Sequence, residues 1–109
     1  MNKFIGSFIF CLLLSSCMNS GEPSGGQVSN EKDMLVYGQK IYESQCRLCH
    51  GEKGDAAFAG AKDLKQTQLN ESSIGDLIYH GKGTMPAFKE ILGEPEINAV
   101  SKYVVALKN

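Results

Sequence analysis

The residues best suited to chemistry are two cysteines and a histidine in the segment Cys46-Arg47-Leu48-Cys49-His50. On a helical turn the cysteines lie three residues apart on one face, so both sulfurs can reach the two vinyl groups along one edge of a porphyrin. His50 follows directly and is placed to ligate the porphyrin iron. This spacing predicts covalent attachment of one c-type haem through Cys46 and Cys49, with His50 as an axial ligand.

The cysteine pair has three other interpretations. A zinc site needs a second pair of ligands, and beyond His80 none exists in the chain that follows the export signal described below. A thioredoxin-like dithiol needs a βαβ pattern, which the sequence lacks. The third alternative is a chance disulfide. The haem interpretation is favoured because the attachment motif occurs in a chain that carries an export signal.

The start of the chain has the form of that signal. Lys3 supplies a positive charge, and the apolar run Phe4–Leu14 is too short to cross a membrane as a helix. The next segment, Leu14-Ser15-Ser16-Cys17, resembles the lipobox of bacterial lipoproteins, in which cleavage precedes the cysteine and the cysteine carries the lipid. We predict a signal peptide at residues 1–16 and lipidation of Cys17. The alternative is an ordinary signal peptide that is cleaved a few residues later.

Cysteine usage agrees with this prediction, because Cys11 leaves with the signal and Cys17 takes the lipid. Cys46 and Cys49 are then the thiols left for haem. Haem attachment of this kind occurs outside the cytoplasm in bacteria. We therefore expect a protein that is exported and lipid-anchored to a bacterial membrane, with its haem domain on the extracytoplasmic, periplasmic side.

Residues 18–33 are rich in Ser, Gly, Asn and Glu and too poor in apolar side chains to fold alone. The predicted organisation is a signal peptide at 1–16, a lipidated cysteine and flexible linker at 17–33, and a folded domain at 34–109. Removing Lys3 with the signal leaves ten basic against twelve acidic residues, a net charge of about −2. This near balance gives no basic excess for binding nucleic acid.

Three helices are predicted in the folded domain, and no stretch shows the alternation of a strand, so the fold class is all-α. The first helix spans about residues 34–45 with Asn30 or Asp33 as its cap, the short second one runs from Asn70 to Gly81, and the last opens at residues 93–96. Their apolar faces are formed by Met34, Tyr37, Ile41 and Tyr42, by Ile74, Leu77 and Ile78, and by Ile97, Val100, Tyr103, Val104 and Leu107.

Three stretches together resemble the class I c-type cytochromes, in their small, single-haem, bacterial form. They are the segment Gly38–His50, the segment Gly81–Phe88 and the closing helix with Tyr103. The resemblance covers about Met34 to the end of the chain. It implies an all-α cytochrome c fold, in which the first and last helices cross and a short third helix helps to surround the haem. Gly38, with Tyr42, would face Val100 and Tyr103 at that crossing.

Met85 is the candidate sixth ligand of the iron. It lies in a glycine-rich loop, and Pro86 keeps it out of helical geometry so that its side chain can project. The resemblance supports ligation by this thioether, which raises the reduction potential. Two rivals are His80, which would give bis-histidine ligation and a lower potential, and Met34, whose position favours a core role. The alternative is that Met85 does not ligate the iron and only fills a gap in the core.

The second shell departs from the family pattern. Many members carry Gly-Pro-x-Leu after the attachment site, and the proline carbonyl accepts the hydrogen bond of the ligating histidine ring. This chain has Ala61-Lys62-Asp63-Leu64 instead, so we expect a backbone carbonyl near Ala61 or Lys62 to take that role. Phe58, Leu64 and Phe88 are candidates for packing against the haem, each with a core role as the simpler interpretation.

The resemblance implies an electron carrier of a respiratory chain, with both axial positions filled and no enzymatic activity. The implied partners are a membrane quinol-oxidising complex as donor and a terminal oxidase or reductase as acceptor. Lys62, Lys82 and Lys89 form either a positive docking patch or scattered solvated charges. The main alternative function is a haem enzyme or gas sensor with an open or labile sixth site. A third interpretation is a thiol-redox or zinc module.

Overall fold

The structure, a computed structural model, describes residues 30–109. This part of the chain contains the α-helices α1 (Glu31–Gln45), α2 (Arg47–His50), α3 (Glu71–His80) and α4 (Glu94–Ala106), and two 3-10 turns, η1 (Phe58–Gly60) and η2 (Leu64–Gln66). Among residues 30–109 there is no strand beyond one isolated bridge, between Lys82 and Met85. The predicted all-α fold is confirmed. The predicted signal peptide, Cys17 and the linker up to residue 29 lie outside the described residues.

Helix α1 begins three residues before its predicted start. The Asn30 side chain caps it by accepting a hydrogen bond from the backbone N–H of Asp33 at 2.8 Å. Glu31 and Asp33 add negative charge to the first turn, where the helix dipole favours it. Residues 31–33, which were predicted to belong to the linker, are therefore helical. No helix within residues 30–109 is long and apolar enough to span a membrane.

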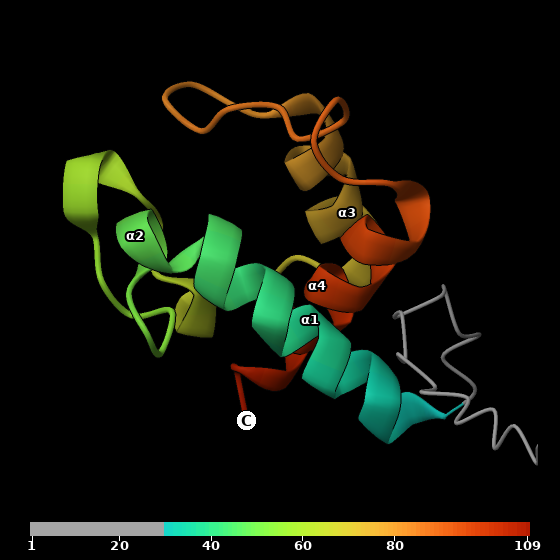
Figure 1. Cartoon of the computed structure of the whole chain (residues 1–109). Coiled ribbons are helices and arrows are strands. Elements are labelled where there is room, and N and C mark those ends of the chain that lie inside the picture. Colours follow the sequence, from blue (N-terminus) through green and yellow to red (C-terminus); the bar gives the residue numbers. More distant parts are fainter. Residues whose placement is uncertain (1–29) are drawn as a thin grey trace, which may run out of the picture.

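Helices α1 and α4 cross at close range (Figure 1). A Cβ atom on Gly38 would lie 2.7 Å from the Ala99 carbonyl carbon and 2.9 Å from Tyr103 Cβ, so only glycine allows this approach. The Tyr42 and Tyr103 rings pack beside the crossing, with their centroids 5.3 Å apart. The predicted crossing at Gly38 is confirmed, but Ala99 rather than Val100 faces the glycine, while Val100 is fully buried in the core.

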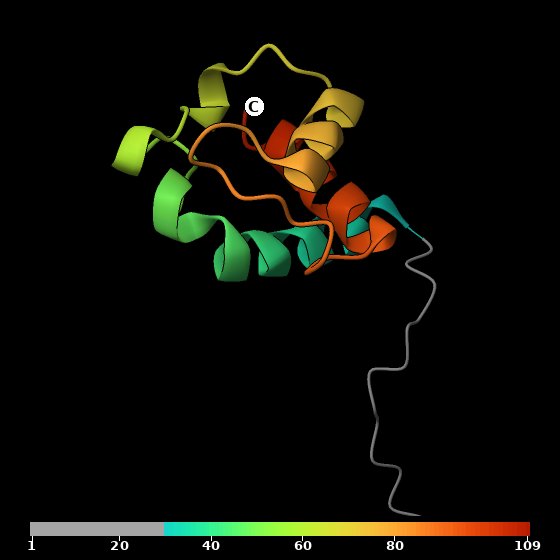
Figure 2. The same cartoon turned by 90° about the horizontal axis from the view of Figure 1, so that it is seen from above.

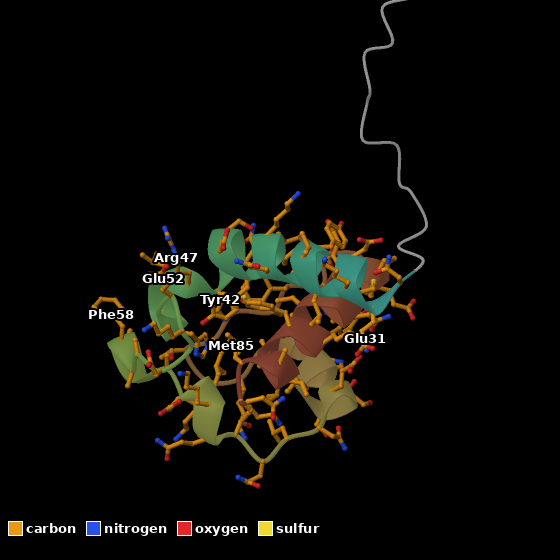
Figure 3. All side chains as sticks on the ribbon, turned by 90° about the horizontal axis from the view of Figure 1, so that it is seen from below. Glu31, Tyr42, Arg47, Glu52, Phe58 and Met85 are labelled. Atoms are coloured by element: carbon orange, nitrogen blue, oxygen red, sulfur yellow. The ribbon has the colours of Figure 1, made fainter. Side chains whose placement is uncertain are left out.

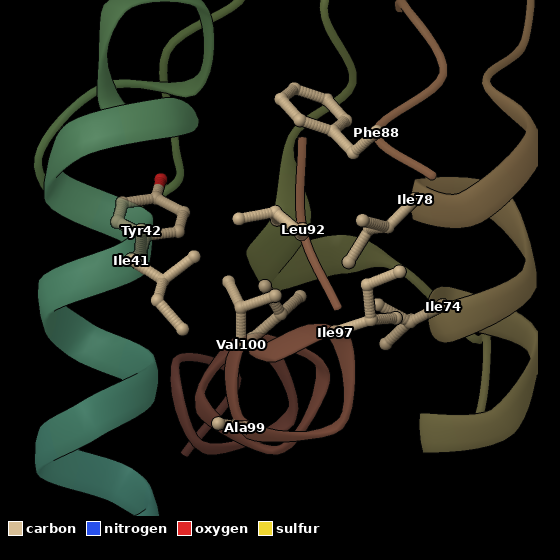
Figure 4. Packing of buried hydrophobic residues seen from close by; sticks show 10 residues of the cluster. Ile41, Tyr42, Ile74, Ile78, Phe88, Leu92, Ile97, Ala99 and Val100 are labelled. Atoms are coloured by element: carbon tan, nitrogen blue, oxygen red, sulfur yellow. The ribbon is translucent and has the colours of Figure 1, made fainter. Parts of the chain in front are cut away.

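Helix α3 packs on α4, and its ends are those predicted. The Asn70 side chain accepts from Ser73 N at 2.9 Å, and the helix stops at Gly81. Figure 4 shows the apolar core between α1, α3 and α4. Its buried members are Ile41, Tyr42, Ile74, Ile78, Phe88, Leu92, Ile97, Ala99, Val100 and Val104.

Glu96 fixes the start of α4 against α1. Its carboxylate accepts from Gly93 N at 2.7 Å through Oε2 and from the Tyr37 hydroxyl at 3.3 Å through Oε1. Burial, together with the Glu96 charge, raises the pKa of Tyr37, so the hydroxyl stays protonated as the donor. The two crossing helices therefore share a polar contact as well as the apolar core.

Candidate haem-binding site

Cys46 forms the break between α1 and α2, and Cys49 lies on α2. The backbone N–H of His50 donates to the Cys46 carbonyl at 3.0 Å, so the segment is one helical turn and places both sulfurs on it, as the spacing predicted. Both thiols are free. Cys46 packs against the core and Cys49 is exposed; burial, helped by Cys49, raises the pKa of the Cys46 thiol to about 11.

The His50 ring is oriented by a single backbone contact. Its Nδ1 lies 2.9 Å from the Lys62 carbonyl oxygen. Because a carbonyl oxygen can only accept a hydrogen bond, Nδ1 carries a proton, and in the neutral ring Nε2 keeps its lone pair. The ring is therefore in the tautomer that can bind a metal through Nε2. A carbonyl at residue 61 or 62 was predicted for this role, and Lys62 supplies it.

The loop after His50 is folded back by three further backbone and side-chain bonds. The buried Tyr42 hydroxyl donates to the Gly51 carbonyl at 2.7 Å, and Ala56 N donates to the His50 carbonyl at 3.1 Å. Leu64 N donates to the Gly54 carbonyl at 2.7 Å. These contacts return the chain to α2 and bring the Lys62 carbonyl to the Nδ1 atom of His50.

Met85 lies in the loop that joins α3 to α4. Its backbone pairs with that of Lys82 through two hydrogen bonds of 3.0 Å, and Phe88 N donates to the Ile78 carbonyl at 2.9 Å. Figures 1 and 2 show this loop reaching from the end of α3 toward the side of the molecule on which α2 lies. The Met85 side chain is half-buried against the core and lies toward the middle of the molecule in Figure 3.

Gly81 determines the path of this loop. Its φ of +71° is in the left-handed region. A Cβ atom there would lie 2.6 Å from the Met85 carbonyl oxygen and 2.7 Å from Ala87 N. The sequence predicted Gly81 only as the end of α3. Its second role, letting the loop turn back beside Met85, depends on a tertiary contact that no local pattern reveals.

The two rival ligands lie elsewhere. His80 is exposed at the end of α3, where its Nδ1 bonds the Asp76 carbonyl at 3.0 Å and its ring meets Tyr79 edge-on at 4.7 Å. It lines a surface groove between α3 and α4 with Glu94. Met34 packs against the core from α1, as predicted. Of the three candidates, Met85 alone is held in a loop directed toward the side of α2.

The packing candidates divide into two groups. Phe88 is buried and Leu64 is half-buried against the core, as expected. Phe58 is 68% exposed and is not part of the core, while its packing against the haem stays a prediction. It lies on η1, a short turn away from the α1–α4 core, and Figure 3 shows it at the edge of the molecule.

The donor atoms of the site fit one cofactor better than a bare metal ion. Within residues 30–109 no three His, Cys, Asp or Glu side chains gather as a metal site, which leaves the zinc interpretation without its ligand set. What the site offers is two thiols for thioether bonds, an imidazole with Nε2 free and a thioether on the loop between α3 and α4. This set suits a covalently attached haem with axial ligation.

Comparison with known proteins identifies the family. A family model described as "Cytochrome C oxidase, cbb3-type, subunit III" matches residues 34–104. The chain belongs to the class I c-type cytochromes. Cytochrome c6 of Leptolyngbya boryana is 35% identical over 74 residues, which cover 62% of this chain and 86% of that protein. Cytochrome c6 of Cladophora glomerata is 32% identical over 82 residues, covering 68% and 89%.

Two solved structures agree with this assignment. Cytochrome c6C from Synechococcus sp. PCC 7002 is 32% identical with a TM-score of 0.59, covering 66% of this chain and 94% of that one. The c-type cytochrome SorU from Sinorhizobium meliloti is 31% identical with a TM-score of 0.59, covering 72% and 94%. As a small class I c-type cytochrome, the chain carries one covalently attached haem c and acts as an electron carrier.

Proposed function

We propose that this c-type cytochrome is a membrane-tethered electron carrier of a respiratory chain, with haem bound through Cys46 and Cys49 and iron held by His50 and Met85. The observation that carries the proposal is the hydrogen bond from His50 Nδ1 to the Lys62 carbonyl, 2.9 Å long. It leaves Nε2 free for the iron beside two free thiols. When bound, the haem supplies a one-electron change between Fe(II) and Fe(III).

Backbone contacts would keep both proposed ligands of that iron in place in the two redox states. The Lys62 carbonyl holds the His50 ring, and the Gly81 turn together with the Lys82–Met85 backbone pair holds the Met85 loop. Held in this way, His50 and Met85 would together occupy the iron of a bound haem and leave no position there for a substrate. We therefore propose that the protein transfers electrons and has no enzymatic activity of its own.

A pair of variants tests the ligand assignment. Met85→Leu removes the thioether and keeps an apolar side chain of similar size, so the reduced protein should bind carbon monoxide. His80→Ala should leave carbon monoxide binding as weak as in the unmodified protein, because His80 lies at the exposed end of α3. The reverse pattern, an open iron in His80→Ala and an unchanged one in Met85→Leu, would replace the proposal with bis-histidine ligation.

The proposed partners are a membrane quinol-oxidising complex as donor and a terminal oxidase or reductase as acceptor. Lys62, Lys82 and Lys89 are exposed, which suits a positive docking patch. Lys62 and Lys82 supply the backbone contacts of the two proposed ligands, His50 and Met85, so their charges flank both sides of the site. Electron-transfer rates with an acidic partner should fall steeply with ionic strength, whereas rates indifferent to salt would exclude docking by these charges.

We also propose that the protein is exported and anchored on the periplasmic side of a bacterial membrane by lipid on Cys17. The support is the lipobox-like segment that precedes Cys17. A Cys17→Ser variant, expressed in its full-length form, should move from the membrane fraction to the soluble periplasmic fraction while keeping its haem. A variant that stays in the membrane fraction would show that another feature anchors the protein.

A further inference from the structure

We infer that Asp63 is a positioning residue for the axial histidine: by holding the Lys62 carbonyl against the His50 ring, its carboxylate lowers the reduction potential of the haem iron. The inference rests on the proposed function, because it takes His50 as the iron ligand. It concerns a residue that contacts neither the haem-attaching cysteines nor the ring itself.

The need for such a residue follows from the sequence around the acceptor. Where many members of the family have proline, this chain has Lys62, which lacks a ring to fix its backbone φ angle. Among the hydrogen bonds of residues 30–109, none has the Lys62 N–H as its donor. The N–H side of Lys62 is therefore not held by a hydrogen bond. The Lys62 carbonyl must be held through Asp63, the residue to which its carbon is bonded.

Asp63 holds that side with both oxygens of its carboxylate. Oδ1 accepts from the backbone N–H of Lys65 at 2.9 Å, which caps the turn η2, and Oδ2 accepts from Gln66 Nε2 at 2.8 Å. The backbone of the next residue, Leu64, is tied to the Gly54 carbonyl at 2.7 Å. The direction of the Lys62 carbonyl depends on the torsions on either side of its peptide bond, and the Asp63 contacts fix those on the Asp63 side.

The strength of the His50–Lys62 contact affects the iron electronically. An imidazole that donates its second N–H is a more basic ligand, and a more basic ligand favours Fe(III) over Fe(II). Loosening the Lys62 carbonyl should therefore raise the reduction potential. The redox equilibrium shifts by the difference in the strength of this hydrogen bond between the two redox states. The free energy of one whole ordinary hydrogen bond, which corresponds to about fivefold, is therefore the upper limit of the shift toward the reduced form.

The test compares variants of the haem-loaded protein by redox titration. Asp63→Ala removes both the cap and the charge, whereas Asp63→Asn removes the charge and keeps an oxygen for Lys65 N. We expect Asp63→Ala to shift the equilibrium toward Fe(II) by up to about fivefold and Asp63→Asn to shift it much less. Asp33→Ala, which removes an exposed acid from the first turn of α1, is the matched control and should leave the potential unchanged.

A second measurement reads the hydrogen bond itself. In the reduced, diamagnetic protein, the ring N–H of His50 should exchange with solvent faster in Asp63→Ala than in Asp63→Asn. Adding Lys62→Pro to Asp63→Ala should restore slow exchange and bring the potential back to about that of Asp63→Asn, because the ring fixes φ at residue 62 but does not restore the charge. The preceding residue suits a proline here: Ala61 has φ −58° and ψ 143°, the region favoured before proline.

The outcomes separate the inference from the function on which it rests. An equal shift in Asp63→Ala and Asp63→Asn would mean that only the charge acts, and would overturn the positioning role. Unchanged exchange of the His50 ring N–H in Asp63→Ala would overturn it as well. If the unmodified protein lacked the spectrum of an iron with histidine and methionine ligands, the proposed function would fail first, whatever the Asp63 variants did.

Discussion

Replacing Gly38 by alanine should strongly destabilise the domain, although alanine is the better helix former. The new Cβ would lie 2.7 Å from the carbonyl carbon of Ala99 and 2.9 Å from Tyr103 Cβ, whereas unstrained carbon contacts are about 3.5–4.0 Å. Because Ala99 meets it with backbone atoms, α1 and α4 would have to separate by about 1 Å. Overpacking of this kind costs about 3 kcal/mol at the upper end of its usual range.

Against that cost stands the gain of about 1 kcal/mol from exchanging glycine for alanine within a helix, so the net loss is about 2 kcal/mol. For a domain of this size, that loss lowers the melting temperature by roughly 8–16 °C. The assay is thermal unfolding of the haem-loaded protein, followed by the helix signal in far-ultraviolet circular dichroism.

Gly75→Ala is the matched control, since it is the same exchange within α3. A Cβ there would lie 3.4 Å from Ser101 Oγ and 3.7 Å from Ile97 Cγ2, which are ordinary contacts. This variant should be as stable as the original or more stable by up to about 1 kcal/mol. A Gly38→Ala protein that melted at or above the original temperature would refute the argument that the helix crossing requires glycine.

Two further predictions concern the loop and the cofactor. Gly81→Ala should displace the Met85 loop and abolish the weak methionine–iron absorption band, because its Cβ would lie 2.6 Å from the Met85 carbonyl oxygen. Gly83→Ala is the control, since a Cβ there meets no neighbouring atom within 4 Å. It should lower the stability of the domain by only about 1–2 kcal/mol and keep the band. A Cys46→Ala, Cys49→Ala double variant should lose most of its helix content in circular dichroism, because a core this small depends on the haem; native helix content in that variant would contradict this dependence.

The helix ends that the sequence predicted well are those decided by local chemistry. The Asn70 cap and the stop at Gly81 each depend on residues within one turn, and both were placed correctly. The start of α1 is not decided by the sequence, because Asn30 and Asp33 are both suitable caps. The structure resolves the choice through the reach of the Asn30 side chain to Asp33 N, which adds the first three residues to the helix.

The features that the sequence missed depend on residues brought together from distant parts of the chain. Ala99 faces Gly38 because of the angle at which α4 crosses α1, and no apolar pattern encodes that angle. Phe58 has an aromatic side chain typical of a core, yet η1 leaves it exposed. The family pattern limits the acceptor of the His50 ring N–H to the carbonyl of residue 61 or 62. Only the folded conformation of the loop shows that it is the carbonyl of Lys62.

The most direct test of the account is the optical spectrum of the exported, haem-loaded protein, oxidised and reduced, with and without carbon monoxide. Ligation by His50 and Met85 predicts a six-coordinate, low-spin haem with the weak methionine–iron charge-transfer band when oxidised, and a reduced spectrum that carbon monoxide does not change. A high-spin haem, or one that binds carbon monoxide readily, would show an open sixth position and would contradict the assignment of the protein as a simple electron carrier.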